Sequence, residues 1–110
     1  MKKKQKRRIV IPDFMIILRV MKLEDKPMTG YMIQKKTMFS AAHIYGMLES
    51  FIEASLIRNA TTEREFILTS KGRTISNLCV NIMKVFNVDD NNMFENRRQR
   101  NTKAVSRFPR

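Results

Sequence analysis

Cations dominate the side chains that could do chemistry in this sequence. The 110-residue chain has 22 lysines and arginines against 10 aspartates and glutamates, so its formal net charge is +12 at pH 7. Residues 1–12 and 87–110 contribute nine of these net charges, and residues 13–86 contribute the other three. A polyanion such as nucleic acid is the natural partner of such charged ends. The alternative is that the basic ends only keep a small protein in solution.

Residues that could support catalysis or bind a metal are few. His43 is the only histidine and Cys79 the only cysteine, and neither has an acid, a nucleophile or a second ligand at a useful spacing. We therefore expect no enzyme activity, no metal and no cofactor. His43 is interpreted either as a donor to DNA or as an ordinary exposed residue, and Cys79 as a small buried hydrophobic residue.

Membrane and secreted proteins are disfavoured. The longest apolar run, residues 14–18, is far shorter than the roughly 18 residues of a membrane span. No signal-peptide pattern follows the basic start, and a lone cysteine fits a reducing compartment. We expect a cytoplasmic protein (nucleoid-associated, or in the host cytoplasm if viral) with no membrane partner and no evident small-molecule ligand.

A helix over residues 40–54 is the element that would position a DNA-binding surface. Ser40 suits its N-cap, because a serine hydroxyl accepts a bond from a first-turn N–H group. Apolar residues at helical spacing define its buried side. These are Ile44, Met47, Leu48, Phe51 and Ile52. The opposite side is small or polar. It holds Ala42, His43, Gly46, Glu49, Ser50 and Glu53. A side this bare would let a DNA groove approach closely.

Two shorter helices precede this one. The first, residues 14–23, is apolar on nearly all sides, which indicates burial at the centre of the domain or against a second subunit. We expect a share in a dimer interface. The second, residues 30–38, follows Thr29 as a cap, and its apolar residues are expected to face inward: Tyr31, Ile33 and Met38.

A hairpin and a last helix follow. Strands at residues 57–58 and 65–68 are joined by a loop in which Asn59 is the one residue suited to a positive φ. Thr69 or Ser70 caps a helix that ends near Phe86.

This order of elements is that of a winged helix-turn-helix domain, mainly α with a small β-hairpin. Three segments resemble the PadR-type transcriptional regulators: residues 28–33 (MTGYMI), residues 40–57, and residues 66–73 (FILTSKGR). The stretch from the first to the last of them, residues 28–73, covers about two-fifths of the chain. The MarR-type regulators are similar more distantly, and small winged-helix proteins of archaeal viruses and plasmids are similar in type.

The resemblance implies a homodimer that sets two recognition helices into successive major grooves of double-stranded DNA. The DNA-facing residues would be Ser40, Ala41, Ala42, His43, Tyr45 and Gly46. Phosphates would be neutralised by Lys35, Lys36, Arg58 and Arg64, the last two on the wing. The terminal helices would form the dimer interface, to which we assign Phe14, Ile16, Val20, Leu78 and Ile82.

The recognition helix departs from that family because it has no lysine or arginine and carries Glu49 and Glu53. Bidentate reading of guanine by arginine is therefore not available from its middle. We interpret the chain as a sequence-specific transcriptional regulator with a basic arm (1–12), a winged-helix domain (13–88) and a basic, flexible tail (89–110). The alternatives are an architectural, largely non-specific DNA-binding protein and an adaptor that binds protein through its apolar first helix.

The arm is expected to contact phosphates through six cations: Lys2, Lys3, Lys4, Lys6, Arg7 and Arg8. Removal of residues 1–8 should weaken binding to all duplexes alike. Because each lost phosphate contact removes about 0.9 from the slope of log K against log salt, the slope should shrink by up to about 5. DNA titrations at several salt concentrations measure this slope. An unchanged slope in the truncated chain would contradict the role given to the arm.

Overall fold

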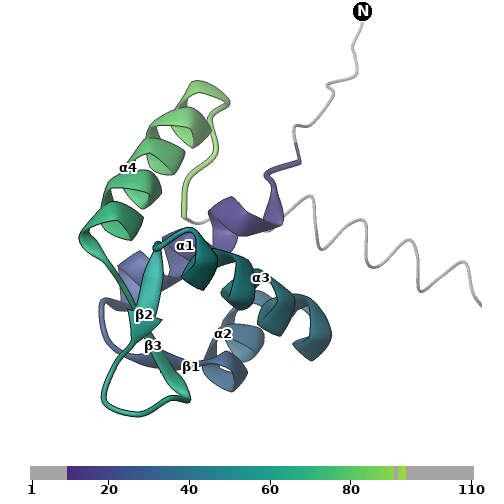
Figure 1. Cartoon of the computed structure of the whole chain (residues 1–110). Helices are drawn as coiled ribbons and strands as arrows, with labels where there is room; N and C mark the ends of the chain where they lie inside the picture. Colours follow the sequence, from purple (N-terminus) through teal and green to yellow (C-terminus); the bar gives the residue numbers. More distant parts are fainter. Residues whose placement is uncertain (1–9, 91, 94–110) are drawn as a thin grey trace, which may run out of the picture.

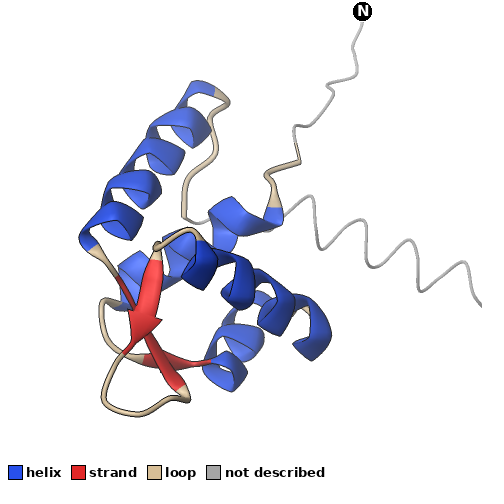
Figure 2. Ribbon diagram, in the orientation of Figure 1, coloured by secondary structure: helices blue, strands red, loops and turns tan. Residues whose placement is uncertain are grey.

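The computed structural model describes residues 10–90, 92 and 93, which form a winged-helix domain (Figures 1 and 2). Its elements are α1 (Asp13–Glu24), β1 (Met28–Thr29), α2 (Gly30–Thr37), α3 (Ala41–Glu53), β2 (Ile57–Asn59), β3 (Glu65–Leu68) and α4 (Ser70–Val85). The three strands form one antiparallel sheet in the order β1-β3-β2. The predicted fold class, mainly helical with a small β-hairpin, is confirmed.

Helix α1 lies at the centre of the domain, and α2, β3 and α4 pack against it. Ile16, Ile17 and Leu18 have no exposed surface. The apolar character of α1 on nearly all sides therefore reflects burial within its own domain. This corrects the dimer-interface assignment of Ile16 and Val20, which are 0% and 6% exposed. Phe14 and Leu23 of α1 stay exposed, at 41% and 48%, so they are the apolar side chains of α1 that the adaptor alternative could still use.

Three helices begin at predicted caps, which are Thr29, Ser40 and Thr69. The Ser40 hydroxyl accepts a hydrogen bond from the His43 N–H group at 3.2 Å, and the Thr69 hydroxyl accepts one from Gly72 at 3.0 Å. Thr69, rather than Ser70, is thus the cap of α4. The Thr69 hydroxyl also donates to the Ser55 carbonyl oxygen at 2.6 Å, which ties the start of α4 to the end of α3.

Strand β1 was missed in the sequence because two residues are too few for a periodic signal. Met28 pairs with Phe66 and Thr29 with Glu65. Thr29 both ends the strand and caps α2, since its hydroxyl accepts from the Met32 N–H group at 3.1 Å. The hairpin therefore closes onto the start of α2, and the wing is attached to the helix-turn-helix.

The hairpin loop is closed by a side chain rather than by a positive φ. The Asn59 amide donates to the Glu63 carbonyl oxygen at 2.9 Å. Among the described residues, positive φ occurs at Asp25, Met38, Ser55 and Asn87, none of which lies in this loop. Asn59 was correctly predicted to lie at the loop, but the expected positive φ is wrong, because Asn59 closes the loop through its side-chain amide.

The chain turns back after α4 and returns to α1, as Figure 1 shows. Asn87 adopts φ 62°, and Arg19 of α1 donates to both carboxylate oxygens of Asp90 at 2.8 and 3.0 Å. This guanidinium lowers the pKa of the Asp90 carboxyl, and Met93 is buried. The predicted flexible tail is thus incorrect for Asp90 and Met93, which are attached to the domain. Residues 91 and 94–110 of that tail, and residues 1–9 of the arm, lie outside the described residues.

The close packing of α4 against the connection between α3 and β2 depends on the absence of a side chain at Gly72. A Cβ at Gly72 would overlap the Leu56 backbone carbonyl oxygen, whereas one at Gly46 would meet no atom within 4 Å. We expect Gly72→Ala to destabilise the fold by about 2 kcal/mol, the usual cost of overpacking. Gly46→Ala, its control, should be neutral or stabilising by up to about 1 kcal/mol, because alanine favours helix. Urea unfolding measures both, and equal stabilities of the two variants would contradict the packing argument.

Candidate nucleic-acid interface

The outward side of α3 is open within the part of the chain that the structure describes. Ile44, Leu48 and Phe51 are buried and anchor the helix, and Met47 packs partly buried against the same core. Ile52 was predicted to be buried as well, and this is incorrect: it is 43% exposed. Five of the predicted DNA-facing residues on the helix are exposed: Ala41, Ala42, His43, Tyr45 and Gly46. The capping residue Ser40 is exposed as well. Small side chains and the free space at Gly46 let another surface approach the backbone of α3 closely.

Tyr45 is held in place by α2. A Cβ at Gly30 would overlap the end of the Tyr45 ring, so glycine is what allows the ring to lie against the first turn of α2. Half of Tyr45 remains exposed. The Gly-Tyr pair at the start of α2 thus has a packing role that the sequence did not reveal, because the partner ring lies fifteen positions along the chain.

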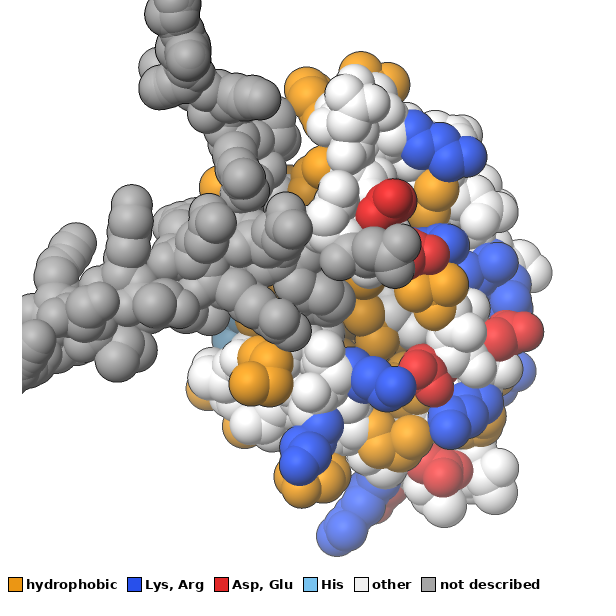
Figure 3. Space-filling view, turned by 180° about the vertical axis from the view of Figure 1, so that it is seen from behind, with side chains coloured by type: hydrophobic (Ala, Val, Ile, Leu, Met, Phe, Trp, Pro, Cys, Tyr) orange, Lys and Arg blue, Asp and Glu red, His pale blue; other side chains and the backbone are white. Residues whose placement is uncertain are grey.

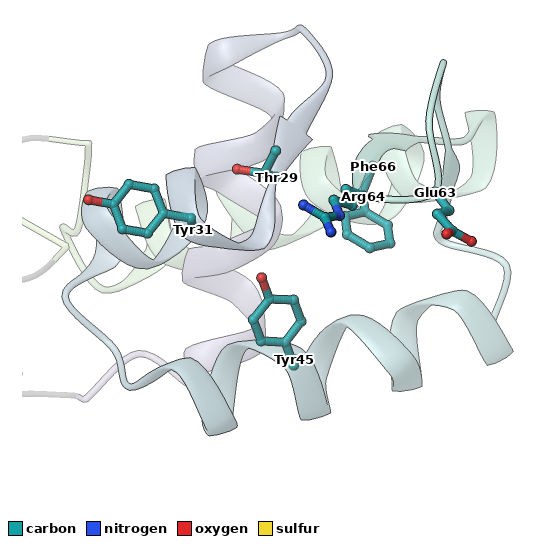
Figure 4. A pocket seen from close by; sticks show the side chains of 6 residues that line it. All are labelled: Thr29, Tyr31, Tyr45, Glu63, Arg64 and Phe66. Carbon is teal, nitrogen blue, oxygen red and sulfur yellow. The ribbon is translucent and has the colours of Figure 1, made fainter.

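A cleft of about 430 Å³ opens between α2, α3 and the wing (Figure 4). It is lined by Thr29, Tyr31, Tyr45, Glu63, Arg64 and Phe66. In Figure 4 the Tyr45 hydroxyl points into this cleft from α3, and Arg64 reaches over Phe66 from the wing. Within the described part of the chain, the Arg64 guanidinium forms no hydrogen bond or ion pair. A cation and a phenol hydroxyl are therefore available to an anion beside α3.

Tyr31 and Met38 were predicted to face inward, and this is incorrect: both are exposed. Only Ile33 of those three side chains is buried. The error arises because α2 has eight residues, and two turns give too little periodicity to fix its orientation. Tyr31 consequently belongs to the cleft, and Lys35 lies near it, with its ammonium 5.7 Å from the centre of the Tyr31 ring.

His43 has a partner within its own chain. Its Nε2 atom lies 2.6 Å from the Asp13 carboxylate at the start of α1, and its ring meets Phe39 edge-on at 5.5 Å. The side chain is nevertheless partly accessible. This contact connects the first turn of the recognition helix to α1 and competes with the predicted role of His43 as a donor to DNA.

The four predicted phosphate contacts are not gathered in one place. Lys36 forms an ion pair with Glu24 at 2.9 Å, and this hydrogen bond lowers the pKa of the Glu24 carboxyl. Arg64 lines the cleft beside α3, whereas Arg58 lines a separate groove that includes Lys71 and Arg73. Of the four, Arg64 lies beside Tyr45, and Lys35 lies beside Tyr31.

The described residues show no cluster of three or more histidines, cysteines, aspartates or glutamates that could hold a metal. Cys79 is buried, as predicted, and its burial raises the pKa of the thiol. Across the same residues, no helix combines the length and the apolar character that a membrane crossing requires.

Comparison with solved structures finds a similar fold in Staphylococcus aureus MarR, solved in complex with salicylate and kanamycin. The two chains share 21% identity with a TM-score of 0.55, and the match covers 84% of this chain and 70% of the other. At this identity the likeness shows the winged-helix fold. No family model and no curated protein matches the sequence.

Proposed function

We propose that this protein regulates transcription by binding duplex DNA as a homodimer, with α3 in the major groove. The exposed outer side of α3, flanked by the Tyr45–Arg64 cleft, is the observation that supports this function. Both the MarR-type likeness of the fold and the predicted PadR-type resemblance agree with a regulator.

The residues of this surface have two separate roles: some leave α3 narrow enough to enter the groove, and others contact the phosphates beside it. Ala41, Ala42 and Gly46 leave the first turns of α3 bare, so the helix can lie deep in a groove about 12 Å wide. The Tyr45 hydroxyl and the Arg64 guanidinium flank it and reach the adjacent phosphates. Such contacts fix the position of the protein on the duplex, while bases are read by the residues of α3 itself.

Architectural, largely non-specific binding is the second candidate, and one observation favours it. Glu49 and Glu53 are exposed on α3 and no cation lies on that helix. Carboxylates repel phosphates and read only the N4 amino group of cytosine among common base contacts. Competition with bulk DNA separates the candidates, because a regulator prefers its site by about a thousandfold or more.

Helix α4 supplies the proposed dimer surface. Leu78, Ile82, Val85 and Phe86 are 52%, 49%, 75% and 46% exposed. The first three follow the i, i+4, i+7 spacing of a single stripe, which a second copy of the same helix would cover. Hydrophobic side chains are visible at the top of Figure 3, over the C-terminal end of this helix. Phe14 is also exposed, so three of the five predicted interface residues stay available: Phe14, Leu78 and Ile82.

Ala42→Glu tests the DNA-binding face. The new carboxylate would lie among phosphates, so the affinity for duplex DNA should fall about tenfold or more. Asn77→Glu, an exposed position on α4, makes the same charge change away from α3 and should lower affinity by no more than about twofold. Fluorescence anisotropy with a labelled duplex measures both. Equal affinities of the two variants would contradict the proposed face.

Ile82→Asp tests the dimer. A charge in the centre of an apolar interface should raise the dimer dissociation constant at least about tenfold. Because Ile82 is half exposed in the single chain, the variant should still fold. Sedimentation velocity measures the shift to monomer, with Asn77→Asp as the control on the same helix. A monomeric parent protein, or an unchanged dimer in Ile82→Asp, would refute this interface.

A further inference from the structure

A second basic surface lies on the other side of the wing from Arg64. It is a groove of about 620 Å³ whose lining includes Arg58 from β2 and Lys71 and Arg73 from α4. Three hydroxyl residues, Ser55, Thr69 and Ser70, complete its polar lining. We call it the rear groove. Neither the proposed recognition surface nor the proposed dimer stripe includes any of its residues apart from Arg58, which was assigned to the wing.

Strand alternation separates the rear groove from the α3 cleft. Ile57 and Leu68 pair across the sheet and are buried, so the next pair, Arg58 and Ile67, must lie on the opposite face. That face is the floor of the rear groove. The Phe66 side chain, which lines the α3 cleft, belongs to the buried face; Leu68 shares that face and, next to the start of α4, also lines the rear groove. One duplex lying on α3 would therefore leave the Arg58 face open.

The charges of the rear groove are largely uncompensated. The Arg58 guanidinium donates to the Asn59 carbonyl oxygen at 3.1 Å, and the Lys71 ammonium donates to the Ala54 carbonyl oxygen at 2.9 Å. Both partners are neutral. Arg73 alone meets a carboxylate, that of Asp25 at 2.7 Å. Arginine has five N–H donors and lysine three, so donors remain free for an anion. Among the described residues that line the groove, none is acidic.

We propose that the rear groove binds the phosphate backbone of a second DNA segment, so that the protein bridges two duplexes. The cations are spread along an open groove on two elements rather than directed at one point, which suits a row of phosphates better than a single small anion. The proposal goes beyond the proposed function, which needs only the α3 face.

Bridging is measured with two short duplexes, one labelled with an energy-transfer donor and the other with an acceptor, mixed with the full-length protein. The parent protein should raise the transfer signal. The double variant Lys71→Glu/Arg73→Gln should lower bridging at least about tenfold. Its control, Lys84→Glu/Lys22→Gln, makes the same change in net charge outside the groove and should bridge like the parent protein.

Affinity for one duplex separates this proposal from the proposed function. The groove variant and its control should bind a single duplex equally, within about twofold, since neither alters α3. Arg73→Gln alone keeps the Lys71 bond to the Ala54 carbonyl oxygen and removes only an exposed ion pair, so it should lower bridging with its stability intact. A parent protein that does not bridge, or a groove variant that bridges as well as its control, would overturn the proposal. If the groove variant lost bridging while Ala42→Glu left single-duplex binding unchanged, the rear groove would be supported and the proposed α3 face would be contradicted.

Discussion

Burial of the middle of α1, from Met15 to Met21, is the constraint from which the rest of the structure follows. A helix with so little polar surface must be covered, and α2, β3 and α4 cover it. Helix α3 then packs its apolar side, Ile44, Leu48 and Phe51, into the same core. Its opposite side is directed outward as a consequence, and the contacts of His43 with Asp13 and of Tyr45 with Gly30 fix it further. The proposed reading surface thus exists because the core is complete without it.

The wing is attached at both ends, and this gives it two usable faces. Strand β1 pairs with β3 next to α2, while Thr69 connects the end of the hairpin to Ser55 at the end of α3. A rigid sheet presents successive side chains on opposite faces. Arg58 of β2 therefore lies on the face opposite to the buried pair Ile57 and Leu68, with Lys71. Arg64, in the loop that precedes β3, lies with Tyr45 in the cleft beside α3. A regulator that also bridges duplexes would use both faces, and the architectural alternative would depend on the same cations.

Most of the fold could be predicted from the sequence, because caps and apolar periodicity are local signals. Ser40, Thr29 and Thr69 begin their helices as expected. What could not be predicted depends on contacts between distant positions. The Arg19–Asp90 pair joins residues 71 positions apart, and periodicity cannot tell burial of Ile16 in its own domain from burial against a partner. At the candidate site, the exposure of the α3 side followed from its residue types. The separation of Arg58 from Arg64 required the sheet register.

The central claim is that the outer side of α3 contacts DNA. Amide chemical-shift mapping of the full-length protein during titration with duplex DNA tests it most directly, since each backbone N–H reports its own surroundings. The account predicts the largest shifts at Ala42, Tyr45 and Gly46, with Arg64 following at the same stoichiometry. Unchanged amides along α3, with shifts confined to α4 or to the chain ends, would contradict it.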